Sequence, residues 1–215
     1  MTPPTVVVLT KAPIPGRCKT RLAPLVGLEQ AALLHRAFTD ATLELLRRTG
    51  LSVTVSVGGD PDGRFQQLLA TRGWTVEAQP PGSLGDRMRS CLQSSGRRVF
   101  VGTDCVVFDP DWITAAATSV APVAIAPSDD GGYWALSVDG GVPPSVLDDL
   151  FVDMPWSTPE VLPLTLRRCS LRGTPVELLP QSYDIDDPSD LSRLFHDSRC
   201  PAQLRSLLET LPCLS

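Results

Sequence analysis

The sequence predicts an α/β fold with a mostly parallel central sheet and helices on both of its faces. Residues 5–10 form a β-branched run without polar alternation, which is typical of a strand buried on both faces. Residues 28–48 then carry apolar side chains at helical spacing and end at Gly50, which suits a left-handed helix cap. Units of strand, loop and helix recur along the chain, and such repeats indicate parallel strands joined by helical crossovers.

The other elements follow the same alternation until the order becomes irregular beyond residue 138. Strands are predicted at residues 51–57, 74–78, 98–102, 123–126, 133–138 and 176–179. Helices are predicted at residues 61–71, 84–95, 158–168, 189–195 and 202–211, with one more opening at Pro110. We see no repeat or linker, and 215 residues suit a single domain, so we predict one domain over residues 1–215.

Composition excludes several classes of protein. With 42% hydrophobic and 20% charged residues the chain resembles a soluble globular protein rather than a disordered one. The net charge of -5 leaves no basic face for the phosphates of DNA or RNA. The longest apolar runs are about six or seven residues, against roughly 20 for a membrane span, and no leader peptide is visible. We expect a cytoplasmic protein without a membrane span; the sequence does not indicate its oligomeric state.

Six cysteines are scattered without a Cys-x-x-Cys pair, and the chain has only two histidines. A zinc site is therefore not expected, and reduced thiols are. Cys18 and Cys105 lie inside motifs of interest, but we interpret them as small buried hydrophobic residues rather than nucleophiles.

A basic loop follows the first strand directly. In open α/β sheets, ligands bind beyond the carboxyl ends of the strands, where Gly16 would let the backbone approach phosphates and basic side chains would hydrogen-bond to them. The spacing is not that of a Walker A motif, and a solvated basic turn is the alternative. The basic residues are Lys11, Arg17, Lys19 and Arg21.

Acidic residues follow two predicted strands. Asp104 follows the strand at 98–102, where its carboxylate could bind Mg²⁺ or Mn²⁺ or simply cap the next helix. Asp184 and Asp186 follow the strand at 176–179 and would share one side of an extended backbone. One or both could meet Asp104 across a single metal, Asp186 ahead of Asp184, while the acidic residues after them cap a helix.

Three further motifs each have a structural alternative. The turn at residues 129–134 has glycines that permit close approach to a ligand, or that simply serve a hairpin. Residues 82–88 open a helix whose amides and Arg87 could hold a base or phosphate, or could form a capped helix start alone. Trp156, followed by Ser157, provides either an acceptor platform or a hydrophobic staple.

In this order the motifs resemble the DUF2064 group, often labelled rSAM-associated or arsenosugar-biosynthesis glycosyltransferases. That group is related to the phospholactate guanylyltransferase and molybdenum-cofactor guanylyltransferase type of nucleotide-diphospho-sugar transferase. The resemblance runs from about Val6 to Leu191, and it departs at Val106, where the group usually has proline. The matching segments are residues 13–22, 82–88, 102–105, 130–133, 155–158 and 184–191.

The resemblance implies a GT-A-like three-layer sandwich with the nucleotide over the first strand and its loop. A Mg²⁺ or Mn²⁺ ion would lie between Asp104 and the segment with Asp184 and Asp186. Catalytic roles are expected for Asp104, Lys19 and Asp130. Nucleotide contacts are expected from Lys11, Pro13, Gly16, Arg17, Lys19, Thr20, Arg21, Gly85, Arg87 and Thr103, and acceptor contacts from Gly131, Gly132, Tyr133, Trp156 and Ser157.

Two reactions stay open. A glycosyltransferase would move a sugar from a nucleoside diphosphate sugar to a small acceptor, and the family label favours this reaction. A guanylyltransferase-like enzyme would join a nucleotide from a triphosphate to a phosphorylated acceptor and release pyrophosphate, and the rich basic loop favours it. A silent nucleotide-binding protein is a third hypothesis; it would be expected to lose either the basic loop or the acidic residues, and both are present.

Overall fold

The strands of the described residues form one seven-stranded sheet in the order β3-β2-β1-β4-β6-β5-β7. The computed structural model describes residues 2–92 and 96–214. The strands are β1 (Thr5–Lys11), β2 (Ser52–Gly58), β3 (Thr75–Ala78), β4 (Arg98–Gly102), β5 (Val123–Pro127), β6 (Tyr133–Val138) and β7 (Val176–Leu178).

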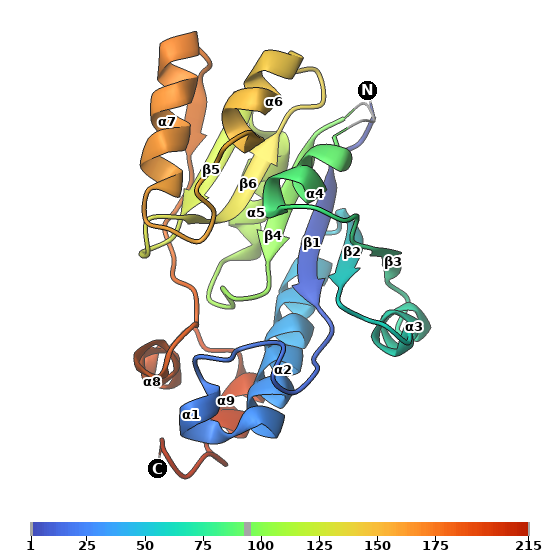
Figure 1. The fold of residues 1–215 in the computed structure, drawn as a ribbon, viewed down its shortest axis with the longest axis vertical. Coiled ribbons are helices and arrows are strands. Elements are labelled where there is room, and N and C mark those ends of the chain that lie inside the picture. Colours follow the sequence, from blue (N-terminus) through green and yellow to red (C-terminus); the bar gives the residue numbers. More distant parts are fainter. Residues whose placement is uncertain (1, 93–95, 215) are drawn as a thin grey trace.

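The sheet is mixed but mostly parallel. β1 pairs in parallel with both β2 and β4, β2 pairs in parallel with β3, and β5 pairs in parallel with β7. β6 alone runs against its neighbours β4 and β5 (Figure 1). The predicted α/β class with a mostly parallel sheet is thus confirmed.

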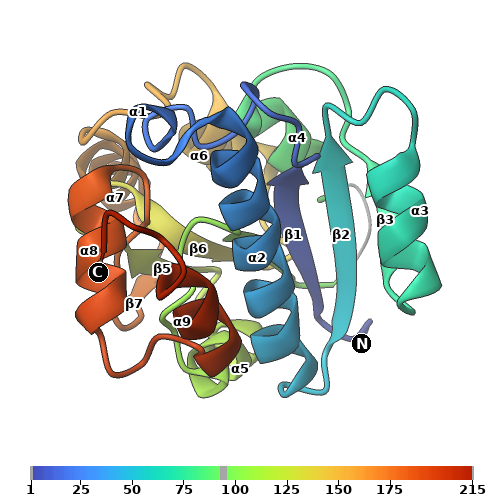
Figure 2. The ribbon, with the colours of Figure 1, turned by 90° about the horizontal axis from the view of Figure 1, so that it is seen from below.

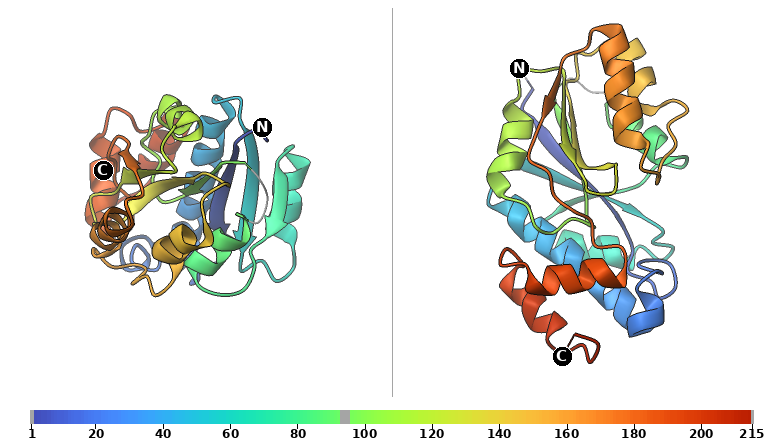
Figure 3. Two further views of the ribbon diagram at one scale, coloured as in Figure 1. Left: turned by 90° about the horizontal axis from the view of Figure 1, so that it is seen from above. Right: turned by 90° about the vertical axis from the view of Figure 1, so that its left-hand side faces the viewer.

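Helices cover both faces of this sheet, so the molecule has three layers (Figures 2 and 3). Residues of α2, α5, α8 and α9 share one hydrophobic core, and residues of α4, α6 and α7 share the other. No helix in the described part of the chain has the length and apolar character needed to cross a membrane. The helices are α1 (Ala23–Val26), α2 (Leu28–Arg47), α3 (Arg64–Thr71), α4 (Leu84–Ser90), α5 (Pro110–Thr118), α6 (Pro144–Phe151), α7 (Val161–Arg172), α8 (Pro188–His196) and α9 (Ala202–Leu208).

The central strand β1 explains why its sequence lacks polar alternation. Val6 and Val8 pack into the core beneath α2, while Val7 packs into the core on the opposite face. All three are at most 3% exposed. Because successive side chains point to opposite faces, a strand between two helical layers needs apolar residues at every position.

The helix predictions differ from the structure in their bounds. Helix α7 starts three residues after the predicted 158, because Ser157 has a φ of +64° and Pro159 follows within a turn. Helix α4 ends at Ser90, and residues 93–95 of the predicted helix lie outside the described residues. Helices α1 and α6 were not predicted, although each has proline in its first turn, as helix starts often do.

Capping boxes fix the starts of α4 and α8. At α4, Ser83 accepts from the backbone of Asp86, which in turn accepts from the backbone of Ser83. At α8, Asp187 and Asp190 make the same reciprocal contacts, as the sequence predicted for these acidic residues. Both devices satisfy amides that the first turn of a helix leaves free, and they fix the residues just before each helix.

Candidate active site

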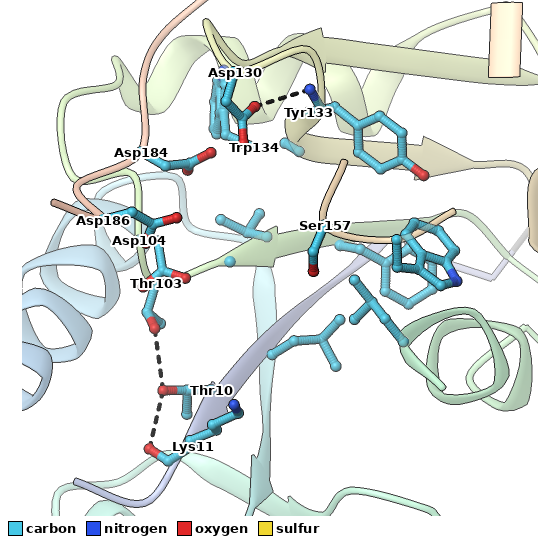
Figure 4. A pocket seen from close by; sticks show the side chains of 18 of the residues that line it. Thr10, Lys11, Thr103, Asp104, Asp130, Tyr133, Trp134, Ser157, Asp184 and Asp186 are labelled. Atoms are coloured by element: carbon cyan, nitrogen blue, oxygen red, sulfur yellow. Dashed lines mark hydrogen bonds between the residues drawn. The ribbon is translucent and has the colours of Figure 1, made fainter. Parts of the chain in front are cut away.

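A cavity of about 600 Å³ opens at the carboxyl ends of β1 and β4 and beside the start of β6. Figure 4 looks into it, with Asp130, Asp184, Asp186 and Asp104 along one side and Thr10 and Lys11 at the far end. The predicted site residues that line it are Lys11, Lys19, Thr20, Arg21, Arg87, Thr103, Asp104, Asp130, Gly132, Tyr133, Trp156, Ser157, Asp184 and Asp186.

The other predicted site residues lie outside this cavity lining, namely Pro13, Gly16, Arg17, Gly85 and Gly131. Arg17 is exposed in the outer part of the basic loop. The two glycines near helices are packing positions instead. A Cβ on Gly85 would come within 2.8 Å of the Phe151 carbonyl oxygen, and one on Gly131 within 2.4 Å of the Pro159 carbonyl oxygen.

Lys19 lies between the two carboxylates that were expected to share a metal. Its Nζ forms ion pairs with Asp104 and, at 2.9 Å, with Asp186, and it also donates to the Ile185 carbonyl oxygen at 2.6 Å. The lysine side chain is 4% exposed, whereas the two carboxylates are 46% and 45% exposed. The Lys19 side chain is thus almost fully buried, while the two aspartate side chains are partly exposed to the cavity.

The charges in this cluster stabilise one another. Burial lowers the pKa of Lys19, but Asp104 and Asp186 raise it more, so its pKa lies above the ordinary value. Burial raises the pKa of Asp104, yet Lys19 lowers it more, so its pKa lies below the ordinary value. Lys19 and Asp104 are therefore both charged at neutral pH.

Asp184, unlike Asp104 and Asp186, forms no ion pair with Lys19. Its carboxylate accepts a hydrogen bond of 2.6 Å from the Ser128 hydroxyl instead. Burial, followed by the charges of Asp104, Asp130 and Asp186, raises the pKa of Asp184 to about 7, although the bond from Ser128 acts in the opposite direction. The cluster thus carries more negative charge than Lys19 neutralises.

The pair Asp104 and Asp186 fits a divalent cation better than the predicted trio does. The described residues contain no group of three or more histidine, cysteine, aspartate or glutamate side chains placed to hold one ion. However, both carboxylates already reach a single cation, the Lys19 ammonium. Mg²⁺ is commonly held by one or two carboxylates together with substrate phosphates and water, so an all-oxygen pair suits it.

Backbone bonds join the chain segments that carry the carboxylates. The amide of Ile185 donates to the carbonyl oxygen of Asp104 at 2.9 Å. The amide of Asp129 donates to the Ser182 carbonyl oxygen at 3.1 Å, which ties the turn after β5 to the same segment. These bonds fix the spacing between side chains that lie far apart in the sequence.

Two positions in the cavity lining have an unusual backbone. Lys19 has a φ of +45° and Ser157 a φ of +64°, and only one other non-glycine residue in the described chain has a positive φ. Such conformations cost of order 1–3 kcal/mol each and tend to persist at functional sites. Figure 4 shows the Ser157 side chain extending into the middle of the cavity.

Gln79 contributes to the site but was missed from the sequence. Its amide nitrogen donates to the carbonyl oxygens of Thr10 and Ser56, both at 2.9 Å, and its oxygen accepts from Arg87 at 2.7 Å. It thus joins the ends of three strands to an arginine of the cavity. A glutamine just after a strand gives no signal of its own, because these partners come from distant parts of the chain.

A second missed group lies under the ends of β1 and β4. The hydroxyl of Thr10 lies 3.2 Å from that of Thr103, which was predicted as a nucleotide contact (Figure 4). It lies 3.1 Å from the hydroxyl of Thr39, which was missed together with Thr10 and His35. His35 lies beside them, with its Nε2 3.0 Å from the Lys11 carbonyl oxygen. Burial lowers the pKa of His35 below its ordinary value, so the ring is neutral at neutral pH.

The basic and acidic residues of the cavity lining come from different parts of the sequence. Every lysine, arginine and histidine among its described lining residues precedes residue 88 in the sequence. The lining residues beyond position 127 include Asp130, Asp184 and Asp186 and no basic side chain. The two groups meet in the cavity, since Lys19 from the first group pairs with Asp186 from the second.

The fold is that of nucleotide-diphospho-sugar transferases. A protein from Desulfovibrio desulfuricans G20, provisionally described as such a transferase, matches with a TM-score of 0.87 and 26% identity, over 100% of this chain and 97% of that one. A nucleotidyl transferase from Methanothermobacter (TM-score 0.59, 16% identity, 90% and 96% coverage) and the inositol-1-phosphate CTP transferase of T. maritima (TM-score 0.55, 12% identity, 96% and 95% coverage) share the fold. No curated protein matches the chain.

Within this class the family is shown by its own sequence model. That model matches residues 42–158, more than half of the chain. The chain therefore belongs to the family described as "Uncharacterized protein conserved in bacteria (DUF2064)", which confirms the resemblance seen in the motifs.

Proposed function

We propose that the protein is a metal-dependent glycosyltransferase that moves a sugar from a nucleoside diphosphate sugar to a small acceptor. The observation that carries this proposal is that basic side chains, carboxylates and aromatic rings line one cavity. Lys11, Arg21 and Arg87 line the cavity and would bind the diphosphate. Asp130 and the aromatic rings of Tyr133 and Trp156 line the same cavity and suit a sugar and its acceptor.

In this reaction the protein binds, orients and deprotonates. An acceptor hydroxyl attacks the anomeric carbon and forms the new glycosidic bond, while the bond from that carbon to the diphosphate oxygen breaks. The nucleoside diphosphate leaves with the bonding electrons, and its charge is stabilised by the basic residues of the loop. The acceptor proton passes to Asp130, whose carboxylate accepts from the Gly132 amide at 2.9 Å and forms no ion pair with any described residue.

Asp104 and Asp186 would hold the divalent cation, Mg²⁺ or Mn²⁺, with Asp184 close by. When bound, the cation would supply positive charge beside the diphosphate and stabilise it as the leaving group. Lys19 would then be released from the carboxylates and be free to pair with phosphate oxygens.

Nucleotidyl transfer is the second candidate, and the number of cations favours it. Four lysine and arginine side chains line the cavity, which is more than a diphosphate requires. In that reaction a phosphorylated acceptor would attack the α-phosphorus of a triphosphate and release pyrophosphate.

A protein that only binds nucleotides is disfavoured because basic and acidic residues meet in one cavity. The cytoplasmic location expected from the sequence stays a prediction.

A thermal-shift screen of nucleoside triphosphates against nucleoside diphosphate sugars, with and without Mn²⁺, tests the proposal. A sugar nucleotide at 100 times its Kd should stabilise the folded protein by about 2.7 kcal/mol, or roughly 5–11 °C. Stabilisation by a triphosphate alone, followed by pyrophosphate release, would instead establish nucleotidyl transfer. No response to any nucleotide would contradict both reactions.

Asp104→Asn supplies the variant for the same screen. It should abolish the Mn²⁺-dependent part of the shift and the turnover, because the amide is a weaker ligand for a hard cation. Asp62→Asn is the matched control, since Asp62 is an exposed aspartate outside the cavity lining. A Mn²⁺-dependent shift of the same size in Asp104→Asn would remove this residue from the metal site.

A further inference from the structure

The side-chain amide of Gln79 can take only one orientation in the cavity lining. Its nitrogen donates to the carbonyl oxygens of Thr10 and Ser56, both at 2.9 Å, so both of its N–H groups are used. Its oxygen accepts from Nη1 of Arg87 at 2.7 Å. The opposite orientation would set oxygen against two carbonyl oxygens and an NH₂ group against a guanidinium, which has only donors. The fold therefore presents an acceptor to Arg87 at a fixed place.

Gly58, at the end of β2, leaves the space that this amide occupies. A Cβ on Gly58 would come within 2.7 Å of the Gln79 Oε1 and within 3.1 Å of its Cδ. The φ of Gly58 is not positive, so glycine is needed here for room and not for its backbone conformation. The position of the Gln79 amide is thus set by the ends of β1 and β2 together.

Arg87 keeps its full positive charge in this arrangement. Among the described residues, Gln79 is the one hydrogen-bond acceptor of the guanidinium, whose Nε has no partner, and no carboxylate pairs with it. A neutral amide fixes a cation without offsetting its charge, as a carboxylate would. Lys19, by contrast, is already paired with two aspartates. Arg87, which lines the same cavity, is therefore available to an anion.

The other two unpaired lysine and arginine side chains among the described lining residues are held less firmly. Lys11 and Arg21 are exposed, whereas Arg87 is partly buried and bonded to Gln79. A long side chain that moves freely in the empty protein loses rotamer freedom when it binds a ligand, and this loss weakens binding. Arg87 has lost part of that freedom already on folding, so it is preorganised for its ligand.

We propose that Gln79 is a positioning residue, which holds the Arg87 guanidinium in place to bind a diphosphate anion. The inference rests on the proposed function only for the identity of the anion, since both reactions considered above release a diphosphate group. Because its N–H groups are both used by carbonyl oxygens and its oxygen by Arg87, Gln79 acts through this arginine and not on the ligand itself.

A double-mutant cycle on pyrophosphate binding tests this proposal. Binding is measured by isothermal titration calorimetry on the full chain, at one fixed Mg²⁺ concentration for all variants. Gln79→Met keeps the length of the side chain without its hydrogen bonds, and it should weaken pyrophosphate binding about fivefold. In the Arg87→Met background the same substitution should change the affinity by less than about twofold, since the residue through which it acts is gone.

Three further variants separate positioning from a general loss of structure. Gln67→Met is the matched control, because Gln67 is exposed on α3 outside the cavity lining, and it should leave the affinity unchanged. In the Arg21→Met background, Gln79→Met should still weaken binding about fivefold, since Arg21 forms no hydrogen bond with Gln79. Gly58→Ala should also weaken binding, because its Cβ displaces the Gln79 amide while Gln79 and Arg87 are both retained.

Unchanged pyrophosphate affinity in Gln79→Met would overturn the proposal, even if this variant unfolds at a lower urea concentration. An equal effect of Gln79→Met with and without Arg87 would also overturn it, as would a wild-type protein that binds no pyrophosphate. If Gln79→Met does not fold, Gly58→Ala takes its place in the cycle, with the same expected dependence on Arg87.

Failure of the proposed function would look different. In that case nucleoside diphosphate sugars would leave the thermal midpoint unchanged, while pyrophosphate would still bind in a manner that depends on Gln79 through Arg87. Conversely, sugar nucleotides that bind the wild type and Gln79→Met with equal affinity, together with unchanged pyrophosphate binding, would retain the proposed function and remove this inference.

Discussion

Removal of the Lys19 ammonium should turn the carboxylate pair into a site for free divalent metal. Lys19→Met keeps the length and apolar stem of the side chain but deletes the charge that Asp104 and Asp186 share. It also leaves the Ile185 carbonyl oxygen without the donor seen in the structure. Two carboxylates would then face each other without the ammonium that neutralises them.

The size of the effect follows from the hydrogen bonds that Lys19→Met removes and from the exposure of their acceptors. Hydrogen bonds to charged groups contribute about 1.5–3 kcal/mol each, but the two aspartates are 46% and 45% exposed and water can replace part of the loss. We therefore expect Lys19→Met to lower the free energy of unfolding by about 2–3 kcal/mol in total. In Lys19→Met a metal ion no longer has to displace the ammonium from the carboxylates. If that displacement costs about 2 kcal/mol in the wild type, the metal should bind the variant about 30-fold more tightly.

Urea unfolding and titration with Mn²⁺ followed by electron paramagnetic resonance, both without nucleotide, measure these two quantities. Mn²⁺ at millimolar concentration should restore most of the lost stability in Lys19→Met and add little to the wild type. Lys11→Met is the control, because Lys11 is an exposed lysine of the same cavity that pairs with no carboxylate among the described residues. If Lys19→Met binds free Mn²⁺ no better than the wild type, the carboxylate pair is not a metal site.

Three further outcomes are expected. Gln79→Leu should lower the free energy of unfolding by about 1–3 kcal/mol in urea unfolding, because it removes a hydrogen bond from each of two strand-end carbonyls and from a guanidinium of the cavity. Gln67→Leu on an exposed helix face should change it by less than about 0.5 kcal/mol. Gly131→Ala should cost more than Gly173→Ala in the same assay, since both have positive φ but only the first would press a Cβ into backbone 2.4 Å away; equal losses would refute the packing role. Burial lowers the pKa of His35, so as pH falls the unfolded state binds a proton at this histidine before the folded state does. The free energy of unfolding should therefore fall as pH drops below about 6.5, and His35→Gln should make this fall with pH less steep. An equally steep fall in His35→Gln would mean that other groups cause it.

The sequence allowed the fold class and the ends of the central strands to be predicted, because buried parallel strands leave a clear apolar pattern. The predicted strands also indicated site residues: Lys19, Asp104 and Asp186 were chosen because each lies in a segment that follows a predicted strand. The contact of Lys19 with both carboxylates could not be predicted from the sequence, because it depends on how far the lysine side chain reaches across the sheet. Two motif glycines, Gly85 and Gly131, were expected to face ligand, but they allow close packing between protein segments instead.

The role of Gln79 was beyond sequence reasoning for a related reason. A polar residue after a strand is ordinary, and its meaning comes only from the three elements that converge on it. The metal, the reaction and the single-domain organisation remain predictions, since each depends on a ligand or a measurement that the fold alone does not supply.

The partners in the carboxylate cluster are separated by a long stretch of chain, since Lys19 and Asp186 lie 167 residues apart. At about 5–20 residues per second, a ribosome adds Asp186 roughly 8–30 s after Lys19. During that interval β1 and its basic loop already exist, but Asp104 is added only about halfway through it, so the lysine has first neither carboxylate and then one of the two. A nascent chain, or one cleaved before this segment, therefore cannot assemble the cluster, and the pocket becomes complete only late in biosynthesis.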